Sequence, residues 1–315
     1  MRKALVVGFN DYPGAPLYGC VNDAVRMESV LKKNGDGSPN FHVKLLTDES
    51  GIVRKGTLKG AIEDLFSSPS DVALLYFSGH GTVDVTGGII VTPDWEPRDE
   101  GISMDWILKV ANDSKARDKI VILDCCNSGE FGNISISSSN VSLLVDGLTV
   151  LTACRNSEYA MEKRGSGVFT SLLIDGLDGG AADLRGNITP GSLYSYVDEA
   201  LGAWDQRPVF KTNVSRFTVL RKITPRVPLE VIRKITDYFE TPEMEYLLDP
   251  SFEFTSETAD QDNVKKFKQL QELFAIGLVI PVDEQYMYFA AINSKSCRLT
   301  AMGYQYWRLV KENNL

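Results

Sequence analysis

The chain has 315 residues, 43% of them hydrophobic, which is enough for about two domains with hydrophobic cores. Its 33 Lys and Arg against 42 Asp and Glu give a net charge of −9, which disfavours nucleic-acid binding and slightly favours basic partners. Five unevenly spaced cysteines argue against a disulfide framework, and only two histidines argue against a histidine-rich metal site. No apolar run is long enough for a membrane span. We therefore expect a cytoplasmic protein that makes no membrane contact.

Short apolar runs alternate with helical patterns from residue 4 to about residue 222. The runs that predict strands are residues 4–9, 41–46, 71–79, 119–126, 147–154 and 207–212. The segments with helical spacing are residues 22–33, 57–68, 103–113, 167–177 and 191–201. Consecutive apolar positions suit strands that are buried on both faces, and the helices supply the crossovers of a parallel sheet. Residues 1–222 are therefore predicted to form a three-layer α/β domain with a mostly parallel six-stranded sheet.

A second domain is predicted over residues 223–315, after a proline-containing boundary. Helical stretches at 229–240 and 263–277, a strand-like stretch broken by a turn at 278–292, and a closing helix at 300–313 resemble a winged helix. This domain carries 10 Lys and Arg against 14 Asp and Glu, a net charge of −4, which argues against binding DNA. A regulatory or partner-docking module is the preferred interpretation.

The strand ends of the first domain are where reactive side chains are expected, because these gather beyond the carboxyl ends of parallel strands. His80 follows the third strand in "YFSGHG", where the flanking glycines leave its ring accessible. The local sequence alone is also compatible with an ordinary loop histidine that has no chemical role. Cys126 follows the fourth strand in "DCCNSG", 46 positions later. A cysteine nucleophile needs a nearby imidazole, and neighbouring strand ends can supply that geometry.

The two adjacent cysteines of "DCC" are expected to differ. Both could simply be small buried hydrophobic residues at a strand end. However, side chains alternate along a strand, which places Asp124 and Cys126 on one side and Cys125 on the other. We therefore expect Cys125 to pack in the core and Cys126 to be the chemically active thiol.

The motifs "GCVNDA", "YFSGHG" and "DCCNSG" occur in the order found in one peptidase family. They resemble the caspase-like cysteine peptidases of the metacaspase and bacterial orthocaspase branch, and the resemblance covers about residues 1–222. The Q-A-C-[RQG]-G sequence of animal caspases is absent. The resemblance implies a caspase-like fold and a cysteine endopeptidase that cleaves after Arg or Lys. A catalytically silent caspase-like scaffold is the alternative.

By this resemblance, Cys126 is the nucleophile and His80 is the general base and acid. The backbone N–H groups of Cys126 and Gly81 would form the oxyanion hole. Asp23, Ser78 and Asp124 would line the pocket for the side chain that precedes the scissile bond. Without the family, Asp23 would also be explained as a helix N-cap.

Two further expectations follow from the same resemblance. Metacaspases often need calcium, and the carboxylates in the corresponding region are Asp94, Asp99, Glu100 and Asp105. These acids could equally belong to a solvated loop. Residues 127–154 contain no Lys or Arg, so any self-cleavage is expected near Lys163 or Arg164.

Overall fold

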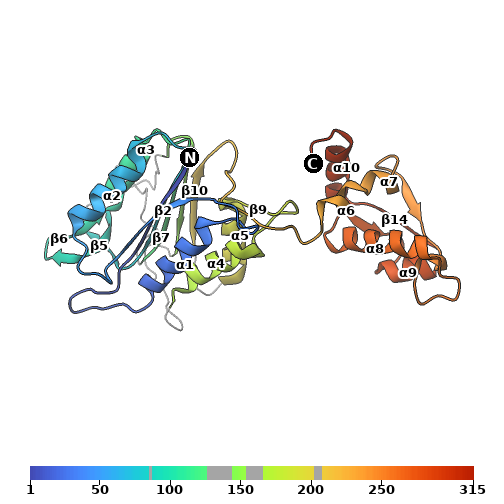
Figure 1. Ribbon diagram of the computed structural model, residues 1–315, viewed down its shortest axis with the longest axis horizontal. Helices are drawn as coiled ribbons and strands as arrows, with labels where there is room; N and C mark the ends of the chain where they lie inside the picture. The colour runs from blue at the N-terminus through green and yellow to red at the C-terminus, as the bar shows by residue number, and fades with distance from the viewer. Residues whose placement is uncertain (85–86, 126–143, 154–165, 202–207) are drawn as a thin grey trace. The chain divides into compact units, whose positions relative to one another are not determined.

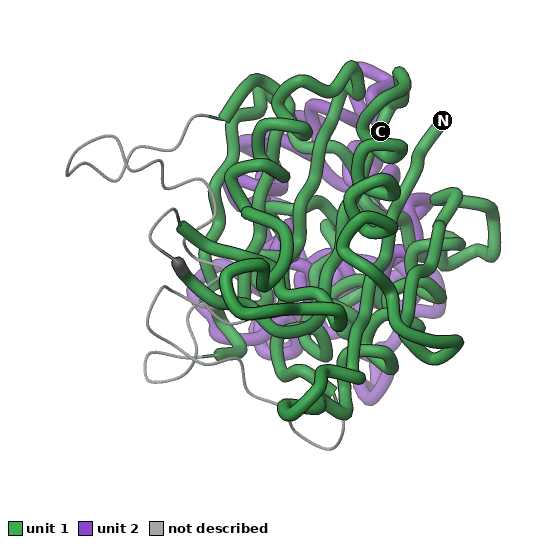
Figure 2. The backbone as a smooth tube through the Cα atoms, turned by 90° about the vertical axis from the view of Figure 1, so that its left-hand side faces the viewer, with its two compact units in different colours: residues 1–223 green, residues 224–315 purple. Residues whose placement is uncertain are grey.

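The protein is described by a computed structural model that covers residues 1–84, 87–125, 144–153, 166–201 and 208–315 (Figure 1). The chain divides into two compact units, Met1–Ile223 and Thr224–Leu315, which are called unit 1 and unit 2 below (Figure 2). In these described ranges, none of the helices combines the length and apolar character that a membrane crossing requires.

Unit 1 contains a six-stranded sheet in the order β10-β8-β7-β3-β1-β2. Only the β10–β8 pair is antiparallel, and the other four neighbouring pairs are parallel. The strands are β1 (Arg2–Gly8), β2 (His42–Thr47), β3 (Val72–Ser78), β7 (Asp118–Asp124), β8 (Leu148–Thr152) and β10 (Val209–Asn213). Each comes from one of the six apolar runs, so the predicted fold class of this domain is confirmed.

Helices cover both faces of the sheet and make three layers (Figure 1). One face carries α2 (Lys55–Ser67) and α3 (Met104–Asn112), and the other carries α1 (Cys20–Lys32), α4 (Val168–Asp175) and α5 (Pro190–Leu201). Alternate residues of each strand feed the two cores. In β1, Leu5 and Val7 pack with α2 and α3, whereas Ala4 and Val6 pack with α1.

A small antiparallel sheet follows His80 and was not predicted. Its strands β4 (Gly81–Asp84), β5 (Gly87–Glu96) and β6 (Asp99–Ser103) lie in the order β4-β5-β6. Two glycines at the start of β5 and Pro93 within it weaken the strand signal of this segment. A further two-stranded pair joins β9 (Asn187–Ile188) to β11 (Arg221–Lys222), and one π-helical turn spans Gly176–Gly180.

Unit 2 has a three-stranded antiparallel sheet in the order β12-β14-β13, together with several helices. The strands are β12 (Glu245–Leu247), β13 (Val279–Pro281) and β14 (Ser296–Leu299). The helices are α6 (Leu229–Arg233), α7 (Ile235–Tyr238), α8 (Gln261–Ala275), α9 (Met287–Ile292) and α10 (Ala301–Lys311), with a 3-10 turn over Pro250–Phe252. The winged-helix-like arrangement stays a prediction.

The strand predicted over the second half of 278–292 is wrong, because Met287–Ile292 is helix α9. Its buried residues are Met287, Ala290 and Ala291, at the spacing of one helical face. Tyr288 and Phe289 are exposed, although aromatic residues favour strands. Likewise, the single helix predicted over 229–240 is two short helices, α6 and α7.

Candidate functional site

Three parallel strands end side by side in unit 1. Ser78, the last residue of β3, pairs with Gly8 of β1 and with Asp124 of β7. The backbone continues this pairing, since Gly79 N donates to Asp124 O at 3.3 Å. His80 and Cys126 each follow the paired residues Ser78 and Asp124 by two positions. The register therefore brings the histidine motif and the strand before the cysteine motif to one edge of the sheet.

The His80 ring is oriented by a backbone carbonyl. Its Nε2 atom lies 2.8 Å from the carbonyl oxygen of Ala15. A carbonyl oxygen can only accept a hydrogen bond, so Nε2 carries the proton in this arrangement. The neutral imidazole then has its lone pair on Nδ1, the nitrogen that is able to take up a proton.

Tyr12 holds the backbone around His80. Its hydroxyl accepts the N–H of His80 at 3.1 Å and donates to the Val91 carbonyl at 3.2 Å, while the two rings pack edge to face at 4.6 Å. Burial raises the pKa of Tyr12 well above its ordinary value, so the hydroxyl keeps its proton. Gly81, the predicted oxyanion-hole residue, is the first residue of β4 and pairs with Ile90.

Asp23 is almost fully buried, at 1% exposure, in the first turn of α1. One of its carboxylate oxygens accepts the hydroxyl of Ser166, and the other accepts the N–H of Gly167 at 2.8 Å. The N-cap residue of α1 is Gly19, and the N–H of Cys20 donates to the side-chain oxygen of Asn10 at 3.0 Å. The N-cap explanation of Asp23 is therefore wrong.

Asp124 is also buried, at 5% exposure, and belongs to a chain of hydroxyl groups. Thr170 donates to Asp124 Oδ2 at 2.6 Å, so the hydroxyl of Tyr76, 2.6 Å from Thr170 Oγ1, donates to Thr170. Burial, followed by the nearby charges of Asp124 and Asp23, raises the pKa of Tyr76 well above its ordinary value. Tyr76 therefore stays a neutral donor at any physiological pH.

The two buried carboxylates meet beside Gly167. A Cβ atom at this position would lie 2.5 Å from Asp124 Oδ2 and 3.1 Å from Asp23 Oδ2. Two of the three predicted pocket residues, Asp23 of α1 and Asp124 of β7, thus converge. The third, Ser78, is buried at the end of β3. Arg26 reaches the same cluster from α1, since it donates to Ser166 Oγ at 2.9 Å.

Ser166, Gly167 and Thr170 were not singled out by sequence reasoning. They come after the apolar strand run 147–154 and lie at the start of α4, in "SGVFT". Their contacts to Asp23 and Asp124 span between 46 and 144 positions of sequence. The one local signal is the pair of small residues directly before a helix.

The four carboxylates suggested as calcium ligands are engaged elsewhere. Both oxygens of Asp94 accept the backbone N–H of Lys55 at 3.0 Å, and the ammonium group of Lys55 pairs with Asp99. Glu100 accepts an N–H from its own turn, and Asp105 lies in the first turn of α3. Within the described ranges, no group of three or more His, Cys, Asp or Glu side chains could hold a metal ion. These donors do not fit the six to eight oxygens of calcium.

Cys126, Lys163 and Arg164 lie outside the described residues. Cys125 is described and is fully buried in the core beneath α2 and α3. The expectation that Cys125 packs in the core is therefore confirmed.

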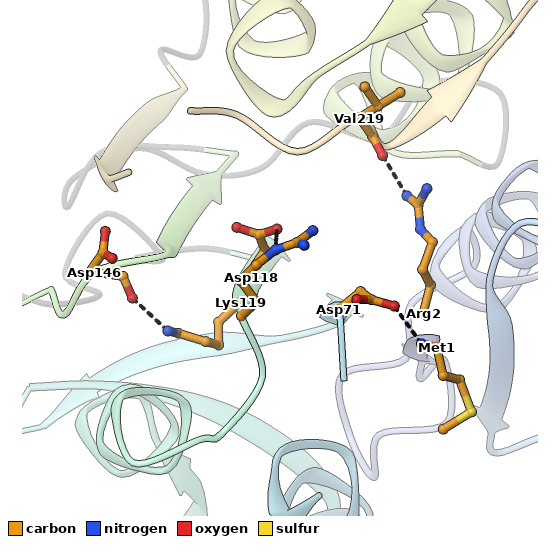
Figure 3. Close-up of polar contacts among 8 residues, drawn as sticks. Met1, Arg2, Asp71, Asp118, Lys119, Asp146 and Val219 are labelled. Carbon is orange, nitrogen blue, oxygen red and sulfur yellow. Dashed lines mark hydrogen bonds and ion pairs between the residues drawn. The ribbon is translucent and has the colours of Figure 1, made fainter. Parts of the chain in front are cut away.

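A cavity of about 530 Å³ lies at the opposite, amino-terminal end of the strands. Its lining includes Arg117 and Asp146, close to the polar contacts that Figure 3 shows. There, Lys119 donates to the Asp146 carbonyl and Arg2 to the Val219 carbonyl, each at 2.6 Å. The candidate site lies at the carboxyl ends of the strands, where functional groups of parallel sheets gather, so the cavity at the amino-terminal ends is separate from it.

Comparison with known proteins agrees with the fold of unit 1. Residues 1–218 match the family model described as "Caspase domain". The structure is similar to that of a structural-genomics protein from Geobacter sulfurreducens, with 17% identity and a TM-score of 0.52, over 71% of this chain and 100% of that one. It is also similar to caspase-1 from Spodoptera frugiperda, with 14% identity and a TM-score of 0.50, over 72% and 92% of the two chains. No curated protein sequence matches the chain.

Proposed function

Because the chain belongs to the caspase-domain family of cysteine peptidases, we propose that it cleaves peptide bonds after Arg or Lys with a Cys126–His80 dyad. The observation that carries this proposal is the orientation of His80 by Ala15, at the end of the strand that pairs with β7. A histidine fixed in this tautomer has the free nitrogen that a thiol nucleophile requires.

The reaction then follows from the chemistry of these groups. His80 takes the proton of the Cys126 thiol, and the thiolate attacks the carbonyl carbon of the scissile bond. Backbone N–H groups of Gly81 and Cys126 stabilise the oxyanion, a contribution of about 3 kcal/mol in related acyl transfers. His80 returns the proton to the leaving amine, and water hydrolyses the resulting thioester.

The preference for a basic side chain is supported by the convergence of Asp23 and Asp124. Two carboxylates that lie this close repel each other and lose hydration energy on burial unless a cation joins them. The guanidinium group of a substrate Arg supplies that cation. Its planar fork can engage both carboxylates, so a substrate Arg should be preferred over Lys. An aspartate at the same position would add a third negative charge.

Unit 2 is proposed to control the peptidase through a protein partner. The excess of acidic residues in unit 2 supports a protein partner over DNA.

Any self-cleavage is proposed to occur near Lys163 or Arg164.

The proposed specificity is tested with matched peptides that end in Arg, Lys or Asp before the cleaved bond. Wild type should cleave the Arg peptide best and leave the Asp peptide intact. Asp23→Asn and Asp124→Asn should each reduce kcat/KM for Arg by more than about tenfold, or ~1.4 kcal/mol. Asp64→Asn, an exposed change on α2, should have no effect. Cleavage of the Asp peptide, or unchanged Arg cleavage by either pocket variant, would refute the acidic pocket.

A further inference from the structure

Unit 2 has a groove of about 600 Å³ between α6 and α8. Helix α8 buries Phe267, Leu270 and Leu273 in unit 2, and other residues of the same helix line the groove. The groove is lined by Pro228, Val231, Lys234, Asp262, Lys265, Lys266, Lys268, Gln269 and Glu272.

The charge of this groove is opposite to that of the unit around it. Unit 2 has a net charge of −4, with 10 Lys and Arg against 14 Asp and Glu. Four of those 10 basic residues nevertheless line the groove, against two carboxylates. Positive charge is thus concentrated at one place on an otherwise acidic unit.

The lysines of the groove are only partly neutralised by their surroundings. Lys265 pairs with Asp262 at 3.3 Å, with both side chains largely exposed, and such a pair is weak. Lys234 donates to the amide oxygen of Gln269 at 3.4 Å, a neutral partner that does not cancel its charge. Lys266 and Lys268 are also exposed on this helix, and Lys268 lies three positions from Lys265, so these two like charges stand close together until an anion enters.

The groove also offers apolar surface. Val231 and Pro228 lie on the α6 side, and the aliphatic stems of the lysines add to it. A ligand that matches both features has carboxylates for the ammonium groups and apolar side chains for the remaining surface. A helix that lies in such a groove is a common mode of peptide recognition.

We infer that this groove binds an acidic peptide segment of a protein partner, one that carries Asp or Glu and aliphatic residues at helical spacing. Duplex DNA is disfavoured because its affinity comes from many phosphate contacts along an extended basic surface, whereas the surface beyond this groove is acidic. The inference rests on the proposed role of unit 2 as a docking module and names the chemistry of its partner.

The test uses the full-length Cys126→Ala chain, so that binding is measured without any cleavage. The probe is a fluorescein-labelled peptide of about 12 residues made of Glu and Leu, with a Gln-for-Glu peptide and a labelled DNA duplex as comparisons. Fluorescence anisotropy should show saturable, salt-sensitive binding of the Glu peptide with a Kd of order 10 µM. The Gln peptide should bind at least about tenfold more weakly.

A matched pair of double variants separates the groove from general electrostatics. Lys266→Glu with Lys268→Glu should weaken Glu-peptide binding by at least about tenfold. Lys295→Glu with Lys311→Glu, which makes the same change in net charge outside the groove, should change the Kd less than about twofold. Lys266→Gln with Lys268→Gln should bind the Glu peptide with an intermediate Kd. This neutral variant is a check in case the double Glu variant misfolds.

Several results would overturn the inference. These are the absence of saturable binding, an equal loss in the two double variants, or tighter binding of the DNA duplex through Lys266 and Lys268. None of these readouts depends on catalysis. Failure of the peptidase proposal therefore leaves the binding result intact, and failure of binding leaves the peptidase proposal intact.

Discussion

At Gly167, the absence of a side chain allows the backbone N–H to reach the buried carboxylate of Asp23, while the carboxylate of Asp124 lies beside the same Cα. Both acids have low solvent exposure, so their geometry is set by these protein donors rather than by water. A side chain at position 167 would displace one carboxylate or the other.

Gly167→Ala is therefore expected to disrupt the acidic pair. The new Cβ would meet Asp124 Oδ2 at 2.5 Å, and such overpacking costs about 1–3 kcal/mol. We expect kcat/KM for Arg peptides to fall at least about tenfold and the melting temperature to drop. The control is Gly60→Ala in α2, where an added Cβ would meet no neighbouring atom within 4 Å. This variant should keep full activity with equal or higher stability. Full activity of Gly167→Ala would contradict the assigned geometry.

Tyr12→Phe tests whether Tyr12 positions His80. The change removes the hydroxyl that joins the His80 N–H to the Val91 carbonyl but keeps the ring contact. We expect kcat to fall about threefold to tenfold, which is ~1 kcal/mol, with KM nearly constant. Tyr18→Phe removes the hydroxyl of a residue that is 75% exposed and close to Tyr12 in the sequence, and it should change neither parameter. An equal effect of the two variants would show that Tyr12 has no positioning role.

The residues of the site differ in how far the sequence could predict them. His80 and Asp124 follow apolar strand runs in short motifs, so their neighbourhood can be inferred from one strand-end rule. Tyr12 and Thr170 act through hydroxyl groups whose partners lie far away in the sequence. No local pattern distinguishes such a hydroxyl from an ordinary polar residue, and only the folded backbone identifies it.

Among the elements, those with strong periodicity were predicted and those with mixed signals were not. The strands of the central sheet are apolar on consecutive positions because both faces are buried, which gives a clear signal. Strand β5 contains Gly88 and Pro93, so its pairing partners decide its conformation. In α9, the aromatic residues suggested a strand, although the spacing of Met287, Ala290 and Ala291 is helical.

Asn10→Ala tests how β1 fixes the start of α1. Asn10 lies just after β1 and caps the free N–H groups at the start of this helix, by accepting those of Cys20 at 3.0 Å and Val21 at 3.3 Å. Loss of the cap should cost about 1 kcal/mol in the free energy of unfolding and, because Asp23 lies in the first turn, should also raise KM for Arg peptides.

The control for this prediction is Asp260→Ala, which removes the cap of α8 in unit 2, where Asp260 accepts the N–H groups of Asp262 and Asn263 at 3.0 Å. It should cost a similar free energy in denaturant unfolding and leave KM unchanged. If both variants changed KM equally, α1 would have no special role in placing Asp23.

Strand β14 carries a thiol whose burial links stability to pH. Burial, and to a lesser degree Glu245, raises the pKa of Cys297 to about 12, from 9.0 for an unperturbed thiol. The unfolded state therefore loses its proton first, so this contribution to stability is complete below about pH 9 and is lost as the pH rises toward 12.

Between pH 9 and 11, the free energy of unfolding of unit 2 should fall more steeply in wild type than in Cys297→Ala, by at most ~1.4 kcal/mol per pH unit. Denaturant unfolding followed by circular dichroism at several pH values measures this difference. Parallel pH profiles of the two proteins would show that Cys297 is not the group responsible.

For the whole molecule, the distribution of cysteines limits which thiols can be the nucleophile. Three cysteines of the described residues, Cys20, Cys125 and Cys297, are buried thiols within the two units. Buried thiols react slowly because the thiolate is disfavoured in an apolar environment. A reactive thiol in the native chain should therefore be found elsewhere, and the proposed mechanism requires it to be Cys126.

The most direct test is the site of covalent labelling by an arginyl peptide chloromethyl ketone, mapped by mass spectrometry of the native full-length chain. We predict a single adduct on Cys126, which forms far more slowly in His80→Ala and does not form with the matching aspartyl reagent. An adduct on Cys125 or Cys154, labelling that is independent of His80, or equal labelling by the aspartyl reagent would contradict the proposal that this chain is an Arg-directed peptidase with a Cys126–His80 dyad.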